Sequence, residues 1–104
     1  MRIGGDDLIT TAGHNKLKDY LQGLIKEGRY VIGSTTYTTP IFRTERSGDV
    51  ITFYLYLADD VSGNISKFQL VDKDGVVFDD QPDSITKSAV NGLLVAFKYT
   101  VRKV

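Results

Sequence analysis

The spacing of apolar residues near the start of the chain predicts one helix. Its apolar positions recur three or four residues apart and are Leu17, Tyr20, Leu21, Leu24 and Ile25. This spacing places them on one face of a helix, with polar residues on the other. Thr10, Thr11 or Asn15 can cap the start of the helix, and Gly28 suits the position just after its end.

From residue 29 onward, β-branched and aromatic residues alternate with polar ones, as is typical of strands. Strand-forming segments, about six in number, cover residues 29–39 (interrupted at Gly33), 41–46, 50–57, 65–72, 76–78 and 92–104. Residues 79–91 are predicted as the longest irregular stretch. The last segment alternates most regularly, with Leu93, Val95, Phe97, Tyr99 and Val101 on one side. One face of this final strand is therefore expected to be buried.

These elements predict an α+β, mainly β fold. One N-terminal helix precedes antiparallel strands that form a sandwich or a curved sheet, with the helix covering one face or end. A chain of 104 residues has the commonest size of a single domain, and no internal repeat or linker is visible. Residues 1–104 are therefore expected to form one domain.

The strand at residues 50–57 is the strongest of the set and has two distinct faces. Its apolar face carries Ile51, Phe53, Leu55 and Leu57. Thr52, Tyr54 and Tyr56 lie on the opposite face. An exposed strip of this kind can bury against a neighbouring subunit or stack on sugar rings, and it can equally be the second face of a sandwich core. The sequence therefore marks these three residues as interface candidates and leaves the alternatives open.

The charge balance excludes one class of function. Thirteen basic and thirteen acidic residues give a formal net charge of zero, which argues against a dedicated nucleic-acid-binding protein. The charges are nevertheless divided along the chain. Residues 59–83 carry seven Asp against two Lys, a charge of −5, and residues 84–104 carry +4. Acidic turns beside a basic terminal strand are expected to help orient subunits.

The acidic turns also suggest a cation site. Its candidate ligands are Asp59, Asp60, Asp72, Asp74, Asp79 and Asp80. Ca²⁺ takes six to eight oxygen ligands, which several turns gathered at one end of a sheet can supply. The alternative is that Asp serves here as a preferred turn residue. No cofactor or metal is therefore expected, and a Ca²⁺ site at these residues is the alternative.

No catalytic constellation is visible in the chain. There is no cysteine, which excludes disulfides, thiolate metal sites and a cysteine nucleophile. The one histidine, His14, is expected as a surface or capping residue at the helix start. A carboxylate pair for glycoside hydrolysis needs a cleft, and a small sheet domain has little room for one. We therefore expect that the chain is not an enzyme.

Targeting signals are also missing from the sequence. The first residues, MRIGGDD, are too polar for the apolar core of a signal peptide. No stretch approaches the roughly 18 to 20 apolar residues that cross a bilayer. Synthesis and first residence in the cytoplasm are therefore expected.

The second half of the chain resembles a known group of proteins. Residues 70–78 (LVDKDGVVF) form a strand and an Asp-x-Asp-Gly hairpin, residues 85–87 (ITK) end a loop, and residues 92–101 (GLLVAFKYTV) form a terminal strand. This order is similar to the C-terminal half of small tail-fibre and baseplate-associated proteins of tailed bacteriophages and prophages. In the first half, a short helix and residues 30–33 (YVIG) agree more loosely with the same group.

The resemblance implies a structural component of a phage or prophage virion, in the tail tip, baseplate or fibre attachment, that acts by protein–protein assembly. Expected partners are other virion or tail proteins or further copies of the chain, with no nucleic acid and no membrane insertion. The interface is expected to combine an edge strand with the strip at Tyr54 and Tyr56. The implied location is the cytoplasm of the bacterial host and then the virion. The alternative is a β module that binds carbohydrate or another ligand, with tyrosines stacked on a glycan.

Overall fold

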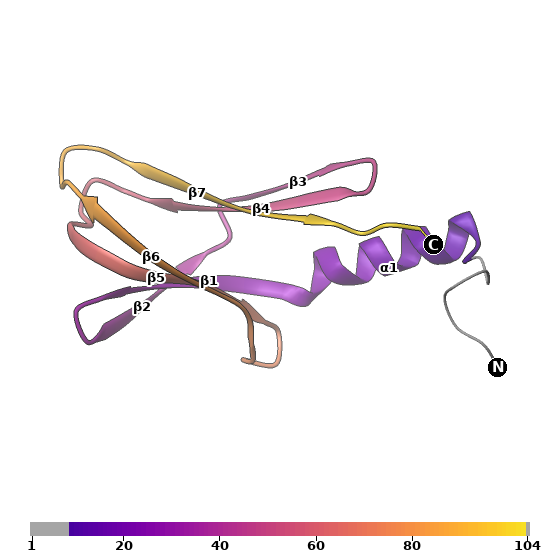
Figure 1. Ribbon diagram of the computed structural model, residues 1–104, viewed down its shortest axis with the longest axis horizontal. Coiled ribbons are helices and arrows are strands. Elements are labelled where there is room, and N and C mark those ends of the chain that lie inside the picture. The colour runs from indigo at the N-terminus through magenta and orange to yellow at the C-terminus, as the bar shows by residue number, and fades with distance from the viewer. Residues whose placement is uncertain (1–8, 104) are drawn as a thin grey trace.

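In the computed structural model, which describes residues 9–103, one helix leads into two antiparallel sheets packed face to face (Figure 1). The elements are α1 (Thr11–Leu24), β1 (Ile25–Ile32), β2 (Thr35–Pro40), β3 (Arg43–Ser47), β4 (Val50–Leu57), β5 (Gly63–Asp72), β6 (Val77–Lys87) and β7 (Leu93–Thr100). The predicted α+β, mainly β class with an N-terminal helix is confirmed.

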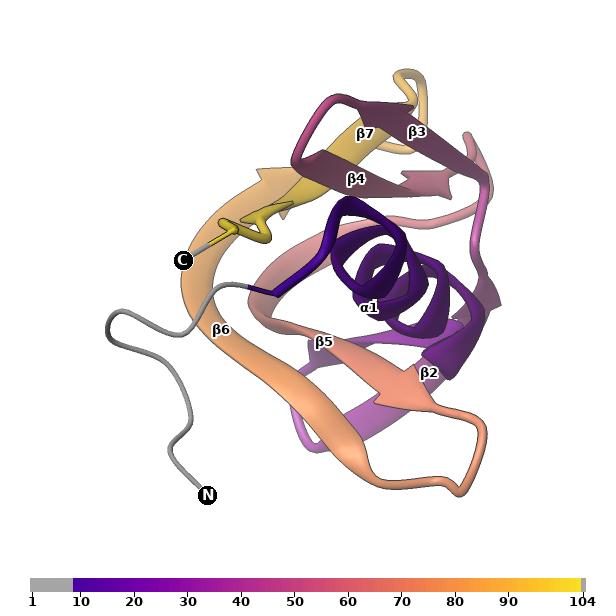
Figure 2. The same ribbon diagram turned by 90° about the vertical axis from the view of Figure 1, so that its right-hand side faces the viewer.

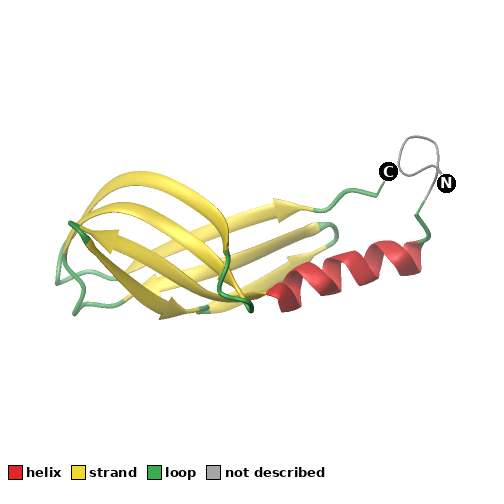
Figure 3. Cartoon of the chain, turned by 90° about the horizontal axis from the view of Figure 1, so that it is seen from below, coloured by secondary structure: helices red, strands yellow, loops and turns green. Residues whose placement is uncertain are grey.

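The two sheets differ in size and share one long axis. The larger sheet has the strand order β2-β1-β5-β6, and the smaller has the order β3-β4-β7. The molecule measures 52 × 24 × 21 Å, and α1 extends from one end of the sandwich as a continuation of β1 (Figure 3). Viewed along this axis, β6 curves from the larger sheet toward β7 of the smaller one (Figure 2).

The core lies between the sheets and is built around β4. The side chains of Ile51, Phe53, Leu55 and Leu57 are at most 2% exposed, as their alternation predicts. They pack in one cluster with Ile65, Phe68 and Leu70 of β5, Ile25 and Tyr30 of β1, and Phe97 of β7. Phe97 and its inward-facing neighbours confirm the buried face predicted for the last strand.

The helix begins where the sequence predicts and ends earlier. Thr10 is the N-cap, and its hydroxyl oxygen accepts a hydrogen bond from the Gly13 amide at 3.0 Å. The predicted end at Gly28 is wrong, because α1 ends at Leu24 and the next residues pair as β1 with β5. Gly28 lies inside that strand, where the side chain of Leu55 crosses directly over its backbone. The glycine therefore makes room for the core and does not cap the helix.

The predicted apolar face of α1 is also wrong in part. Leu17 and Tyr20 are 49% and 61% exposed, whereas His14 and Lys18 are buried. The part of α1 that carries His14 and Lys18 lies beside the ends of strands. Backbone carbonyl oxygens at those ends need hydrogen-bond donors. Nε2 of His14 lies 2.7 Å from the Val101 carbonyl oxygen, so His14 is not the surface residue that the sequence suggests. Within residues 9–103, no helix is long and apolar enough to cross a membrane.

The predicted irregular stretch at residues 79–91 is largely a strand. Val77–Lys87 form β6, which pairs with β5 in antiparallel register. Asp and Pro rarely occur in strand interiors, and β6 contains four such residues: Asp79, Asp80, Pro82 and Asp83. The sequence pattern therefore does not predict this strand. Pro82 is tolerated because β6 is an edge strand, and it lies at a register shift in the β5–β6 ladder.

Gly28→Ala is expected to lower the free energy of unfolding by about 1–3 kcal/mol, the usual cost of overpacking a core. A Cβ at this position would lie 2.9 Å from Cγ of Leu55 and closer still to both of its methyl carbons. Gly23→Ala is the matched control, because nothing lies within 4 Å of a Cβ there. It should raise the free energy of unfolding by up to about 1 kcal/mol. Urea denaturation measures both, and equal effects would contradict the packing assigned to Gly28.

Lys18→Met is expected to loosen α1 from the sandwich. Nζ of Lys18 donates to the Gly48 carbonyl oxygen at 3.2 Å and to Oδ1 of Asp49 at 3.1 Å. Methionine keeps the apolar stem and removes both bonds, at a cost of about 1–3 kcal/mol in unfolding free energy. Lys16→Met, at an exposed position of the same helix, should change it by no more than about 0.5 kcal/mol. Hydrogen exchange of the α1 amides should rise in Lys18→Met alone, and similar exchange in both variants would refute this anchoring role.

Candidate functional site

The outer face of the three-stranded sheet carries the predicted interface strip. Thr52, Tyr54 and Tyr56 alternate along β4 with the core residues and point away from them. Since β4 is the middle strand, Thr52 and Tyr54 have cross-strand partners on both β3 and β7, whereas Tyr56 has one on β7 alone. On β7, Tyr56 lies opposite Leu94 and Thr52 lies opposite Lys98. The face is therefore a surface built from three strands.

One end of this face is apolar, and we call it the aromatic end: Phe42, Tyr56 and Leu94. These side chains are 57%, 41% and 50% exposed, respectively. The rings of Phe42 and Tyr56 are 5.3 Å apart between centroids and tilted by 36°. Sequence reasoning missed Phe42, which lies between β2 and β3, and Leu94, which belongs to the outward set of β7. The alternation of β7 was the signal that could have identified Leu94.

Tyr56 is held in place by its surroundings. A Cβ on Gly92 would lie 2.7 Å from Cζ of Tyr56 and closer still to its hydroxyl oxygen, so the tyrosine tip rests on the glycine backbone. Phe42 packs against the same ring. A ring fixed in this way loses little conformational freedom when a partner covers it.

Tyr54 belongs to a polar cluster at the middle of the face. Its hydroxyl donates to Oε1 of Glu45 at 2.6 Å, and this hydrogen bond raises the pKa of Tyr54 above its usual value. The guanidinium carbon of Arg43 lies 4.8 Å from the ring centroid, and Nη2 of Arg43 lies 3.8 Å from Oε1 of Glu45. Tyr54 thus borders the aromatic end with a hydrogen-bonded rim.

Thr52 is recessed below the surface. It is 9% exposed and lies in a shallow hollow of ≈ 390 Å³. Glu45 of β3 and Lys98 of β7 are its cross-strand neighbours, and both line this hollow. Of the three predicted interface residues, Tyr56 is therefore the most accessible, Tyr54 forms the rim and Thr52 is covered.

The acidic residues considered for Ca²⁺ do not come together. Oδ1 of Asp72 accepts from the amides of Asp74 and Val76, both at 2.9 Å, and so closes the β5–β6 turn. Asp59 and Asp60 lie in the β4–β5 connection, away from that turn. Within residues 9–103, no group of three or more acidic or histidine side chains is placed to hold a metal ion. In the β5–β6 turn, the aspartate side chain therefore stabilises the turn by accepting backbone hydrogen bonds. This is the role of a preferred turn residue, which was the alternative to a Ca²⁺ ligand.

Asp79 and Asp80 lie on β6 and are bound to neighbouring strands. Oδ2 of Asp79 accepts a hydrogen bond from the hydroxyl of Tyr99. Burial, together with this bond, raises the pKa of Tyr99. Oδ1 of Asp80 accepts from the Gln69 amide at 3.0 Å and lies 3.5 Å from Nζ of Lys67. These contacts tie β6 to β5 and β7.

Comparisons of the chain with protein-family models, with curated proteins and with solved structures found no match. The resemblance to phage tail proteins therefore stays a prediction.

Proposed function

We propose that the chain is a non-enzymatic structural module of a bacteriophage or prophage particle, in the tail tip, baseplate or fibre attachment, that acts by binding other proteins. The observation that carries this proposal is the aromatic end: two packed rings and a leucine exposed on a rigid sheet. The assignment to a phage particle is supported by the resemblance of residues 70–78 and 92–101 to tail-fibre and baseplate-associated proteins.

The composition of the face supports protein binding. Interfaces concentrate their binding energy in a few aromatic or arginine anchors surrounded by a polar rim. Phe42 and Tyr56 supply the rings, and Arg43, Glu45 and Lys98 supply charges at the border. Because the inner face of this sheet packs in the core, the sheet is rigid and holds the anchors in their binding positions before a partner arrives.

The same exposed rings favour one alternative, a module that binds carbohydrate. Sugar rings stack on exposed aromatic faces, and the hydroxyl of Tyr54 with Glu45 could orient a sugar by hydrogen bonds. A heat signal above dilution, when cell-wall glycans are titrated with and without Ca²⁺, would favour this alternative over assembly.

Tyr56→Ser is expected to weaken association with protein partners by about tenfold or more, since truncating an aromatic anchor commonly costs over 1 kcal/mol. Sedimentation velocity over a concentration series measures self-association, and capture of purified phage tail proteins measures binding to other partners. Tyr37→Ser is the matched control, because Tyr37 is a similarly exposed, ring-stacked tyrosine on the other sheet. It should leave association unchanged.

Two outcomes would contradict the proposal. One is a wild-type chain that stays monomeric at every concentration and captures no tail protein. The other is an equal loss of association in Tyr56→Ser and Tyr37→Ser, because that would place the binding energy elsewhere on the molecule.

A further inference from the structure

The sandwich is open along one side, between β6 of the larger sheet and β7 of the smaller one. Both are edge strands of their sheets. Figure 2 shows β6 curving toward β7, and the ladders described for residues 9–103 do not join them. We call the space between these two strands the seam.

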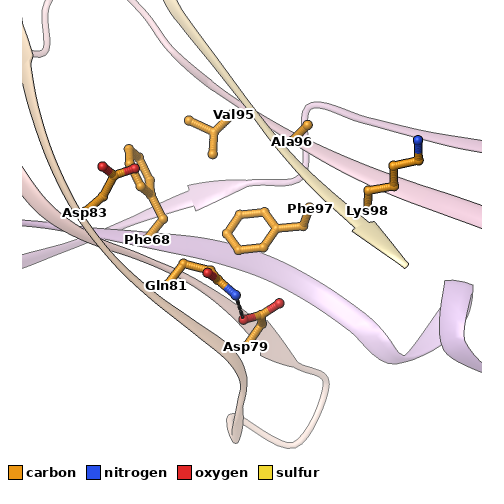
Figure 4. A pocket seen from close by; sticks show the side chains of 8 residues that line it. All are labelled: Phe68, Asp79, Gln81, Asp83, Val95, Ala96, Phe97 and Lys98. Carbon is orange, nitrogen blue, oxygen red and sulfur yellow. Dashed lines mark hydrogen bonds between the residues drawn. The ribbon is translucent and has the colours of Figure 1, made fainter. Parts of the chain in front are cut away.

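A cavity of ≈ 330 Å³ lies in the seam (Figure 4). Its floor includes the core rings of Phe68 and Phe97. Its two banks are Asp79, Gln81 and Asp83 on β6, and Val95, Ala96 and Lys98 on β7. The seam is therefore apolar at its base and acidic along the β6 bank.

Side-chain contacts bound the seam at both ends. At one end, the hydroxyl of Tyr99 donates to Asp79. At the other, Nζ of Lys87 donates to the carbonyl oxygens of Val61, Ser88 and Asn91 at 2.7, 3.0 and 2.6 Å and so fixes the β6–β7 turn. Between these ties the two strands stay apart.

Within residues 9–103, the backbone groups of β7 that face the seam pair with no other strand. The Val101 amide donates to the Asp49 carbonyl oxygen at 2.8 Å. This bond shows which amides of the β7 strand point toward β4 in the antiparallel ladder, namely those of the odd-numbered residues. Amides alternate in direction along an antiparallel strand. Those of Leu94, Ala96 and Lys98 therefore point away from β4, toward the free edge.

Of the four edges, β7 is the least protected against a further strand. β2 ends in Pro40, β3 carries three charged residues in five, and β6 contains Pro82 and three Asp. Proline and charge are the usual means of blocking an edge. The eight residues of β7 include no proline and one charge, on Lys98.

A second copy of the chain is a poor occupant of this edge. Pairing two β7 strands edge to edge would bring two β6 strands together, each with Asp79, Asp80 and Asp83. Like charges placed opposite one another destabilise such an interface. A basic strand from another polypeptide has the complementary charge.

We propose that the seam binds an extended basic strand of a partner protein, paired with the free edge of β7. Asp79, Gln81 and Asp83 alternate along β6, so their spacing matches a partner strand with two basic residues four positions apart. An apolar residue midway between these would pack on Phe68 and Phe97. This inference rests on the proposed function for the premise that the chain binds another polypeptide, and it adds a second surface and the chemistry of its partner.

A synthetic peptide tests the charge and register of the partner. The probe is acetyl-Thr-Arg-Thr-Val-Thr-Arg-Thr-amide, and the control peptide has Glu in place of both Arg. Calorimetric titration should show binding of the basic peptide and no binding of the acidic one. In the wild-type protein, the basic peptide should slow hydrogen exchange at the amides of Leu94, Ala96 and Lys98. Equal binding of both peptides, or unchanged exchange at these amides, would overturn the proposal.

Variants test the two halves of the seam. Ala96→Pro removes an outward amide and leaves the amides that face β4 intact, so peptide affinity should fall by about tenfold or more. Asp83→Asn should weaken binding several-fold, whereas Asp74→Asn, in the β5–β6 turn, should not. If thermal melting shows that Ala96→Pro does not fold, the Asp83 variant and the wild-type exchange data decide. Full affinity in a folded Ala96→Pro protein would overturn strand pairing.

Tyr56→Ser separates this inference from the proposed function. Tyr56 lies on the outer face and does not line the seam cavity. Peptide binding should therefore be unchanged in this variant even where association through the aromatic end is lost. If Tyr56→Ser lost peptide binding together with association, the seam would not be a separate site and the proposal would be overturned. If the wild-type protein bound no peptide, the seam proposal would fail while the function proposed for the aromatic end would stand.

Discussion

Burial of one face of β4 between the two sheets is the constraint on which the rest of the structure depends. Ile51, Leu55 and their neighbours on this face are almost fully excluded from solvent. Side chains alternate along a strand, so this burial commits Tyr54 and Tyr56 to the opposite, outer face. It also demands a glycine at position 28, where Leu55 occupies the space of a Cβ. The core and the candidate interface are thus two faces of the same strand.

The sequence predicts best those features that depend on local periodicity. β4 and β7 alternate over their full lengths and are both predicted as strands, although β7 ends at Thr100 and the predicted extension through residues 101–103 is wrong. Thr10, one of the three caps that the sequence offers, is the N-cap. β6 has no such pattern, because its Asp and Pro residues suit turns, and pairing with β5 decides its structure. The end of α1 is likewise set by tertiary pairing, since Ile25 has an apolar side chain that suits either a helix or a strand.

The face of α1 shows a second limit of periodicity. The pattern identifies Leu17 and Tyr20 as apolar, but it cannot tell what the helix packs against. The helix meets the ends of strands, where carbonyl oxygens need donors, and His14 and Lys18 supply them. For the same reason, the outer face was predictable at Tyr56 and not at Phe42, whose position depends on the path between β2 and β3.

The divided charge of the chain takes a different meaning in three dimensions. The acidic and basic segments of the sequence include β6 and β7, which the fold places beside each other across the seam. Lys98 of β7 lines both the seam cavity and the hollow on the outer face. No ion pair joins it to a carboxylate of β6 among the described residues. The carboxylates of Asp79 and Asp83 therefore leave the β6 bank acidic beside an edge that can accept a strand. A partner that pairs with β7 must satisfy both the backbone of one strand and the charge of the other, and this double requirement is what would make such a seam selective.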